Sequence, residues 1–193
     1  MIRDEAKGLT VRLFSRLMKA FSRAPVEQQL AGESRTTERL AKLERLRTIL
    51  EVAFSRETAS PGTETQGRPP SAGQCAAVSV IVWDRFGGEF VSATVQGQSH
   101  WFNRLNIGGR VIDVDLTGDQ FGLKAVRFGK PGSLWAGTRL RTAQELREET
   151  VRRAILLAEK AGLKDTQKRL LSLLNSAAAK VRTSDLDNSA RER

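Results

Sequence analysis

The chain has 193 residues, a formal net charge of +10, one cysteine and one histidine. This length predicts one domain, or one domain with extensions. A single cysteine excludes an internal disulfide framework and fits a reducing, cytoplasmic location. No run approaches the ~20 apolar residues that span a bilayer, and no signal-peptide pattern opens the chain, so we expect no transmembrane segment.

The positive charge lies mainly toward the two ends of the chain, where basic and acidic residues are interleaved. Interleaved charges of this kind are typical of solvated helix faces with pairs four residues apart. No zinc-finger, P-loop or RNA-binding aromatic motif accompanies them. We therefore expect no specific nucleic-acid partner, and we keep a basic nucleic-acid-binding or regulatory protein as the third-ranked function.

The first part of the chain predicts two helices and a loop. Residues 9–23 alternate apolar and basic side chains at helical spacing, which predicts an amphipathic helix that packs on its own domain or lies on a membrane. A second helix is predicted from an N-cap at Thr36 or Thr37 to Ser55, because leucines recur there every three to four residues. Residues 57–71 are rich in Thr, Ser, Gly and Pro and predict a loop.

The segment from Cys75 to Phe86 is apolar and opens with small residues. Its β-branched side chains favour a strand, whereas its length and the stop signal at Gly87 favour a buried helix, which we predict. Cys75 then lies in the first turn of that helix. Unpaired backbone N–H groups and the helix dipole favour a thiolate at such a position.

Three strand-like runs follow, at residues 89–95, 100–105 and 110–116. The last two are joined by Asn106 to Gly109, a strong hairpin signal. Residues 121–140 show no clear period.

The hairpin register decides which polar side chains meet. A symmetric loop pairs Leu105 with Arg110, and it then places His100 directly opposite Asp115 on the same face of the sheet. At that spacing the carboxylate can accept the imidazole N–H. Asp113 faces the same side one pleat away and is the reserve candidate.

The C-terminal part predicts two more helices. Thr142 to Glu145 matches a capping box and begins a helix that stops at Gly162. A last helical segment is predicted over residues 166–181, and residues 182–193 are expected to be disordered.

Cys75, His100 and Asp115 together meet the requirements of thiol acyl transfer. The thiolate attacks a carbonyl, the imidazole acts as base and then as acid, and the carboxylate orients the imidazole. Backbone N–H groups near Cys75, helped by the Gln74 amide, would hold the oxyanion. Each residue also has a structural reading, since a lone cysteine is most often a small buried hydrophobe. One Cys, one His and two Asp make a poor zinc set, so we expect no metal and no other cofactor.

Four ordered motifs carry a family resemblance over about residues 42–162. The chain resembles the small bacterial YunG-like family, whose members show related motifs, and its layout is similar to the wider papain-like and transglutaminase-like group. The resemblance implies Cys75 as nucleophile, His100 as base and Asp115 as orienting residue. The motifs are Gly73-Gln74-Cys75, Phe86-Gly87-Gly88-Glu89, His100-Trp101-Phe102-Asn103-Arg104-Leu105 and Asp115-Leu116-Thr117-Gly118-Asp119-Gln120-Phe121.

From these observations we expect an α+β domain of papain-like or transglutaminase-like fold, with a central Cys-bearing helix on a small antiparallel sheet. The expected division is a helical extension over 1–41, a core over 42–164, and a C-terminal helix and tail over 165–193. The expected activity is hydrolysis or transfer at an amide, isopeptide or thioester carbonyl of a peptide, protein or small acyl substrate. A non-catalytic protein-binding module is the main alternative, and the sequence leaves the oligomeric state open. The oxyanion and substrate-binding residues are expected to be Gln74, Trp101, Asn103 and Asp113.

Overall fold

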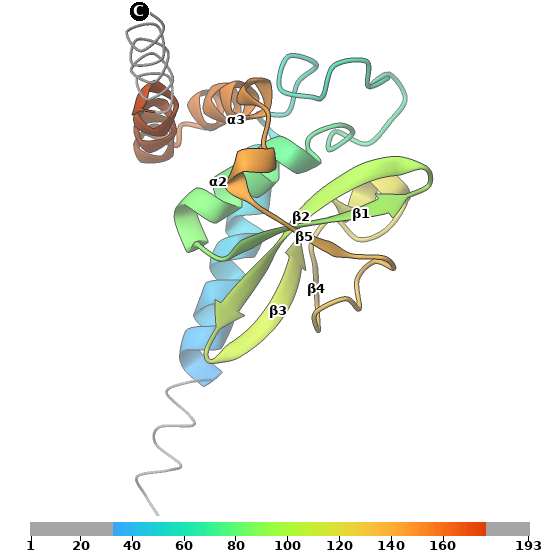
Figure 1. Ribbon diagram of the computed structural model, residues 1–193, viewed down its shortest axis with the longest axis vertical. Helices are drawn as coiled ribbons and strands as arrows, with labels where there is room; N and C mark the ends of the chain where they lie inside the picture. Colours follow the sequence, from blue (N-terminus) through green and yellow to red (C-terminus); the bar gives the residue numbers. More distant parts are fainter. Residues whose placement is uncertain (1–32, 177–193) are drawn as a thin grey trace, which may run out of the picture.

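The computed structural model describes residues 33–176 and has an α+β architecture (Figure 1). Two helices, α2 and α3, are flanked by helical residues 33–51 and 164–176. The elements between them are α2 (Cys75–Phe86), β1 (Glu89–Val95), β2 (Gln98–Ile107), β3 (Arg110–Asp115), the 3₁₀ helix η1 (Gly118–Phe121), β4 (Arg127–Gly129), β5 (Arg139–Arg141), the 3₁₀ helix η2 (Ala143–Glu145) and α3 (Glu148–Lys160).

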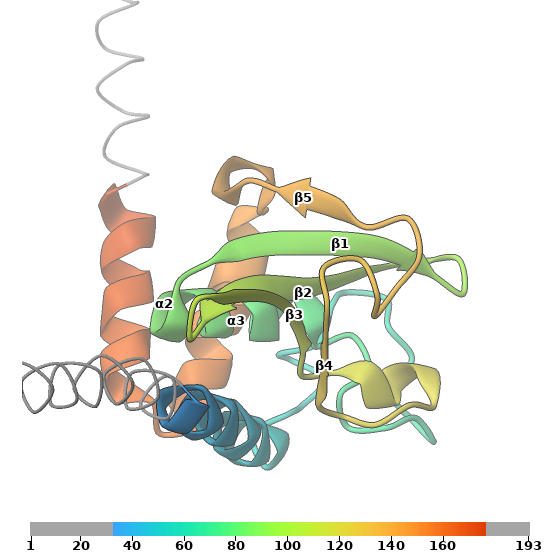
Figure 2. The same ribbon diagram turned by 90° about the horizontal axis from the view of Figure 1, so that it is seen from below.

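The strands form one sheet in the order β4-β3-β2-β1-β5, and every neighbouring pair is antiparallel. The first three strands follow one another as a meander, and β5 returns to the outer edge of β1. The helices gather on one side of the sheet, and α2 packs against both β2 and α3 (Figure 2). The α+β class and the antiparallel sheet expected from the sequence are therefore confirmed.

Side chains that alternate along the strands supply two apolar clusters, one on each face of the sheet. The larger cluster lies between the sheet and the helices. It includes Leu43 and Leu50 of the first helix, Ile81 of α2 and Leu157 of α3. The smaller cluster, Val91, Ala93 and Phe102 with Val95 and Trp135, covers the opposite face. Full burial of each large aliphatic side chain contributes about 1.5–3 kcal/mol.

The segment predicted as a buried helix is α2. Residues Cys75–Val82 are all buried, as expected for a helix that is apolar all round and enclosed by other elements. Burial outweighs the strand preference of its valines. Gly87 ends the helix with a φ of 73°, and its N–H donates to the carbonyl of Trp83.

The β2–β3 register differs from the predicted one by two residues. Ile107 pairs with Arg110, so the loop is Gly108-Gly109 and Leu105 pairs with Ile112 instead of Arg110. The two glycines have φ values of 61° and 80°, which a two-residue type I′ turn requires at both positions. A shift of two residues keeps every side chain on its predicted face.

Two predicted helix starts are wrong. Residues 33–36 are already helical, so neither Thr36 nor Thr37 is an N-cap, and the helical conformation stops at residue 51. The Thr37 hydroxyl instead donates to the carbonyl of Glu33 within the helix. The capping box at Thr142 is present, but it caps the short η2. Leu146 is extended, so α3 begins only at Glu148.

Several expectations fall wholly or partly outside the described residues. The amphipathic helix over 9–23 and the tail over 182–193 lie there, as does the end of the last predicted helix. The boundary expected at 41/42 falls within helical residues 33–51, and the domain division itself stays a prediction. Within residues 33–176, no helix combines the length and apolar character that crossing a membrane requires.

Candidate thiol-imidazole site

Cys75 is the first residue of α2, and the turn before it depends on a glycine. Gly73 has a φ of +72°, and a Cβ at this position would approach the Thr63 hydroxyl oxygen to 2.7 Å. The Gly73 carbonyl accepts a hydrogen bond from the N–H of Ser60, which ties the preceding loop to the start of α2. Cys75 is 6% exposed. Its thiol therefore lies at the N-terminus of α2, next to a loop that a backbone hydrogen bond holds in place.

His100 and Asp115 form a fully buried pair. The His100 Nε2 and Asp115 Oδ2 atoms are 2.8 Å apart, and both side chains are 0% exposed. The indole N–H of Trp135 donates to the same carboxylate oxygen at 2.9 Å. The other oxygen accepts from the backbone N–H of Thr117 at 2.9 Å and from its hydroxyl at 3.2 Å. Donors at both oxygens stabilise a carboxylate that has no access to water.

The second ring nitrogen of His100 faces the Gln120 amide. Gln120 Nε2 lies 3.2 Å from His100 Nδ1 and donates to the Thr117 carbonyl at 3.0 Å. Phe121 and Trp135 approach the imidazole edge-on, with ring centroids at 4.9 and 5.1 Å. The ring is thus held on both sides, with Nε2 directed to Asp115.

The pKa of His100 is raised from 6.5 to about 9. Burial is the largest influence and lowers the pKa, but hydrogen bonds to Asp115 and to Cys75 and the negative charges of both groups outweigh it. Cys75, which precedes His100 in the sequence by a helix and a strand, is thus among the groups that raise its pKa. Pairing of β2 with β3 stops at Asn103, which leaves the β2 edge at His100 without a β3 partner.

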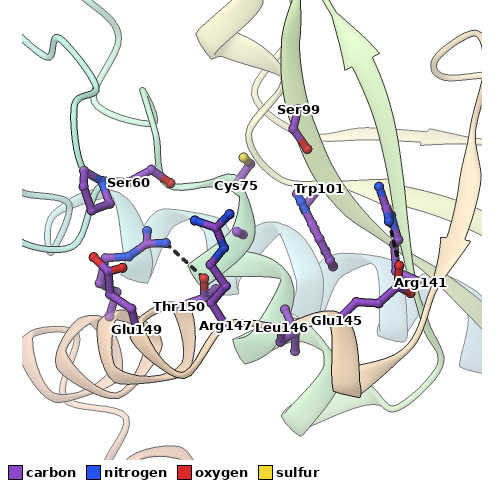
Figure 3. A pocket seen from close by; sticks show the side chains of 13 residues that line it. Ser60, Cys75, Ser99, Trp101, Arg141, Glu145, Leu146, Arg147, Glu149 and Thr150 are labelled. Carbon is purple, nitrogen blue, oxygen red and sulfur yellow. Dashed lines mark hydrogen bonds and ion pairs between the residues drawn. The ribbon is translucent and has the colours of Figure 1, made fainter.

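Cys75 lines a cavity of about 490 Å³, a volume within the range of small-molecule sites (Figure 3). The walls come from the loop at Ser60, the start of α2, strand β2, β5 and the region from η2 into α3. The lining side chains include Ser60, Cys75, Ser99, Trp101, Arg141, Glu145, Arg147, Glu149, Thr150 and Arg153.

One of the four expected binding residues, Trp101, lines this cavity. The Gln74 amide nitrogen donates to the Ser55 carbonyl at 2.9 Å, and the Asn103 amide nitrogen donates to the Ser79 carbonyl at 3.1 Å. Both side chains are 1% exposed. Asp113 is held by Arg104 in a two-pronged ion pair. The side chains of these three residues thus have partners within the fold, and the oxyanion and binding roles expected for them stay predictions.

Sequence reasoning assigned no site role to Gln120, Thr117, Trp135 or the three arginines of the cavity. Thr117 and Gln120 could have been found, since they follow Asp115 by two and five residues within one motif. Trp135 lies in a stretch without a clear period, and no pattern connects it to Asp115. No pattern in the sequence distinguishes the three arginines from its other basic residues.

No three His, Cys, Asp or Glu side chains gather as a metal site in the described part of the chain.

The YunG protein family matches residues 42–156, which is more than half of the chain. The chain belongs to the YunG family. A relative from Bacillus subtilis (strain 168), described as uncharacterized protein YunG, is 32% identical over 79 residues. That match covers 41% of this chain and 63% of the relative, so the chain spans less than two thirds of the relative's length. No solved structure gives a significant match.

Proposed function

We propose that this protein is a thiol-dependent acyl hydrolase or acyl transferase that forms an acyl intermediate on Cys75. The observation that carries the proposal is the joint placement of the three groups. Cys75 begins a helix, lines a cavity and is among the groups that raise the pKa of His100, while Asp115 Oδ2 lies 2.8 Å from His100 Nε2. This arrangement supports the proposal, because nucleophilic catalysis requires a nucleophile, a base that acts on it and a group that orients the base.

In the first half-reaction, the Cys75 thiolate attacks the carbonyl carbon of an amide, isopeptide or thioester, and a carbon–sulfur bond forms. The negative charge on the carbonyl oxygen faces the first backbone N–H groups of α2, which have no partner within the helix. The tetrahedral adduct collapses, the bond to the leaving group breaks, and the His100 imidazolium protonates that group.

In the second half-reaction, neutral His100 accepts a proton from water or from an acceptor amine, which attacks the thioester carbon. Breakage of the carbon–sulfur bond releases the carboxylic acid or new amide and regenerates the thiolate. Asp115 keeps Nε2 protonated throughout, so Nδ1 is the nitrogen that exchanges the proton, and its hydrogen bond from the Gln120 amide forms only while the ring is neutral.

The proposal extends to the finer fold class. The order helix-borne cysteine, strand-borne histidine, strand-borne aspartate agrees with a papain-like or transglutaminase-like domain. The YunG family membership of residues 42–156 supports the same ordered motifs but names no reaction.

The test is the rate of Cys75 alkylation by iodoacetamide between pH 6 and pH 8. Cys75 is the only cysteine, so no other thiol contributes. When the pH is lowered from 8 to 6, the alkylation rate of a free thiol falls on the order of 80-fold, because its thiolate fraction follows a pKa of about 8.5. For Cys75 we expect the alkylation rate to fall less than about fivefold from pH 8 to pH 6, because His100 remains an imidazolium and stabilises the thiolate. His100→Gln should restore the steep dependence, while Asp84→Asn, at the other end of α2, should not.

A protein-binding module remains the second candidate, and the 6% exposure of Cys75 is the observation that favours it. That alternative requires a thiol that reacts only after unfolding. Incubation with a panel of peptide thioesters, followed by intact-protein mass spectrometry, distinguishes the two. An acyl adduct on the wild type that is absent from Cys75→Ser supports the enzyme, and a thiol inert to iodoacetamide and thioesters refutes it.

A further inference from the structure

The cavity beside Cys75 is rich in arginine. Arg141, Arg147 and Arg153 line it together with two carboxylates, Glu145 and Glu149, which leaves an excess of one positive charge. A catalytic pocket for an uncharged acyl group has no need of this arrangement, so each of the three arginines must be accounted for.

Arg141 is neutralised by its neighbours. Its guanidinium is 2.6 Å from a Glu145 carboxylate oxygen, donates to the Ser92 hydroxyl and lies 5.7 Å from the centre of the Trp101 ring. It therefore holds one wall of the cavity together and has little capacity left for a ligand.

Arg153 is fixed but not neutralised. Its two terminal nitrogens donate to the Thr58 carbonyl at 3.3 Å and to the Thr150 hydroxyl at 3.2 Å, both uncharged acceptors. Burial lowers the pKa of Arg153, and the charges of Glu149 and of Cys75 oppose that effect. The guanidinium thus lies within electrostatic reach of the thiol, on a side chain that cannot swing away freely.

Arg147 is the arginine without a partner. It precedes α3, its side chain is exposed, and it forms no ion pair with any residue in the range 33–176. Figure 3 shows its guanidinium extending into the same cavity as the Cys75 sulfur. Glu149 lines the cavity too, and its negative charge is among those that raise the pKa of Arg153, although the two side chains form no ion pair. Arg147 is therefore the arginine that the carboxylates of the cavity compensate least.

We infer that Arg147 and Arg153 form a subsite for a single carboxylate of the substrate, next to the carbonyl that Cys75 attacks. The inference rests on the proposed function for the identity of the attacked group. A carboxylate fits better than a phosphate because Glu149 would repel a second negative charge, whereas an excess of one positive charge matches a monoanion. The substrate class is then an acyl compound with a free carboxylate near the scissile bond, either a terminal one or an acidic side chain.

The first test compares two alkylating reagents of similar size, the anion iodoacetate and the neutral iodoacetamide, on the full chain. The measured quantity is the ratio of their second-order rate constants for Cys75. We expect Arg147→Gln to lower this ratio about fivefold, the size expected for one partly exposed charge pair. The matched control is Arg152→Gln, since Arg152 lies on α3 five residues after Arg147, binds Glu148 and does not line the cavity. Equal ratios in the wild type and both variants, or equal decreases in both variants, would overturn the subsite.

A second test keeps the subsite testable if Cys75 proves inert and the acyl-transfer proposal fails. N-acetylglycine, its amide and the α-amide of N-acetylaspartate are titrated into the protein while the Trp101 indole NMR signal is followed, with assignment by Trp101→Phe. A saturable shift with either acid but not with N-acetylglycinamide, lost in Arg147→Gln, supports the subsite. The acid that binds more tightly identifies a terminal or a side-chain carboxylate. No shift, or tighter binding of inorganic phosphate than of both acids, would refute it.

Discussion

Replacing Asp115 by asparagine tests the central electrostatic claim, because it keeps the size of the side chain and removes its charge. The carboxylate accepts hydrogen bonds at both oxygens, from His100 and Trp135 at Oδ2 and from Thr117 at Oδ1. The amide NH₂ of an asparagine must replace one of these oxygens. At either end it then meets an N–H donor inside a site closed to water.

The cost has two parts. A buried donor without an acceptor destabilises the fold by about 1–3 kcal/mol at every pH. The second part depends on pH. The folded-state pKa of His100 is raised to about 9 from 6.5. This contribution to stability is therefore fully present below about pH 6.5 and is lost as the pH rises through 9. It amounts to about 3 kcal/mol at most. We expect the variant to lose roughly 4–6 kcal/mol at pH 6 and about 1–3 kcal/mol at pH 10.

Two measurements check this expectation. His100 is the only histidine, so its ring proton NMR signal can be followed from pH 5 to pH 10 without overlap. We expect a midpoint near pH 9 in the wild type and a lower one in Asp115→Asn, where only Cys75 still opposes the effect of burial. Urea unfolding at pH 6 and pH 10 gives the two free energies, with Asp84→Asn as the control. A His100 titration midpoint below pH 6.5 in the wild type, or the same midpoint in the wild type and in Asp115→Asn, would refute the reasoning.

Three further substitutions test the packing at Gly88 and the role of Asn103. Gly88→Ala should cost more than about 3 kcal/mol in urea unfolding, because φ is +84° and the new Cβ would lie 2.4 Å from the Arg104 carbonyl oxygen. Gly87→Ala has a similar φ of +73° but open space around it, so it should cost only about 1 kcal/mol; equal costs would contradict the steric argument. Asn103→Ala should lower stability by about 1–3 kcal/mol through loss of its bond to the Ser79 carbonyl. The substitution should leave the Cys75 alkylation rate unchanged. A rate lowered tenfold would instead support the binding role that the sequence predicts for Asn103.

Local patterns predicted most of the elements between residues 75 and 116. The apolar run at Cys75, bounded by Gly87, gave the correct helix, and β1 was predicted with its observed bounds. The turn residues at 108 and 109 predicted the hairpin. The predicted register was wrong by two residues because a loop centred on Ile107-Gly108 puts a β-branched residue at a positive φ, whereas Gly108-Gly109 supplies the two glycines that a type I′ turn favours.

Tertiary contacts decided the short edge strands and the partners of the buried amide side chains. The three-residue strands β4 and β5 are too short to show a period, and they form only where β3 and β1 offer free edges. The sequence predicts Gln74 and Asn103 as binding residues by their chain positions. In the structure their amide nitrogens donate to the carbonyls of Ser55 and Ser79, and such buried carbonyls need a donor. Long-range partners of this kind leave no local trace.

The sequence by itself determined which residues could do chemistry here, because one cysteine and one histidine leave no choice of thiol or imidazole, and their spacing assigned them to a helix start and a strand. Only the tertiary structure decided their surroundings. Trp135 reaches Asp115 across 20 residues, and Arg153 reaches Thr58 across 95. Hydrogen bonds and charges act through space. The groups that set the pKa of a side chain are therefore fixed by packing and not by order along the chain.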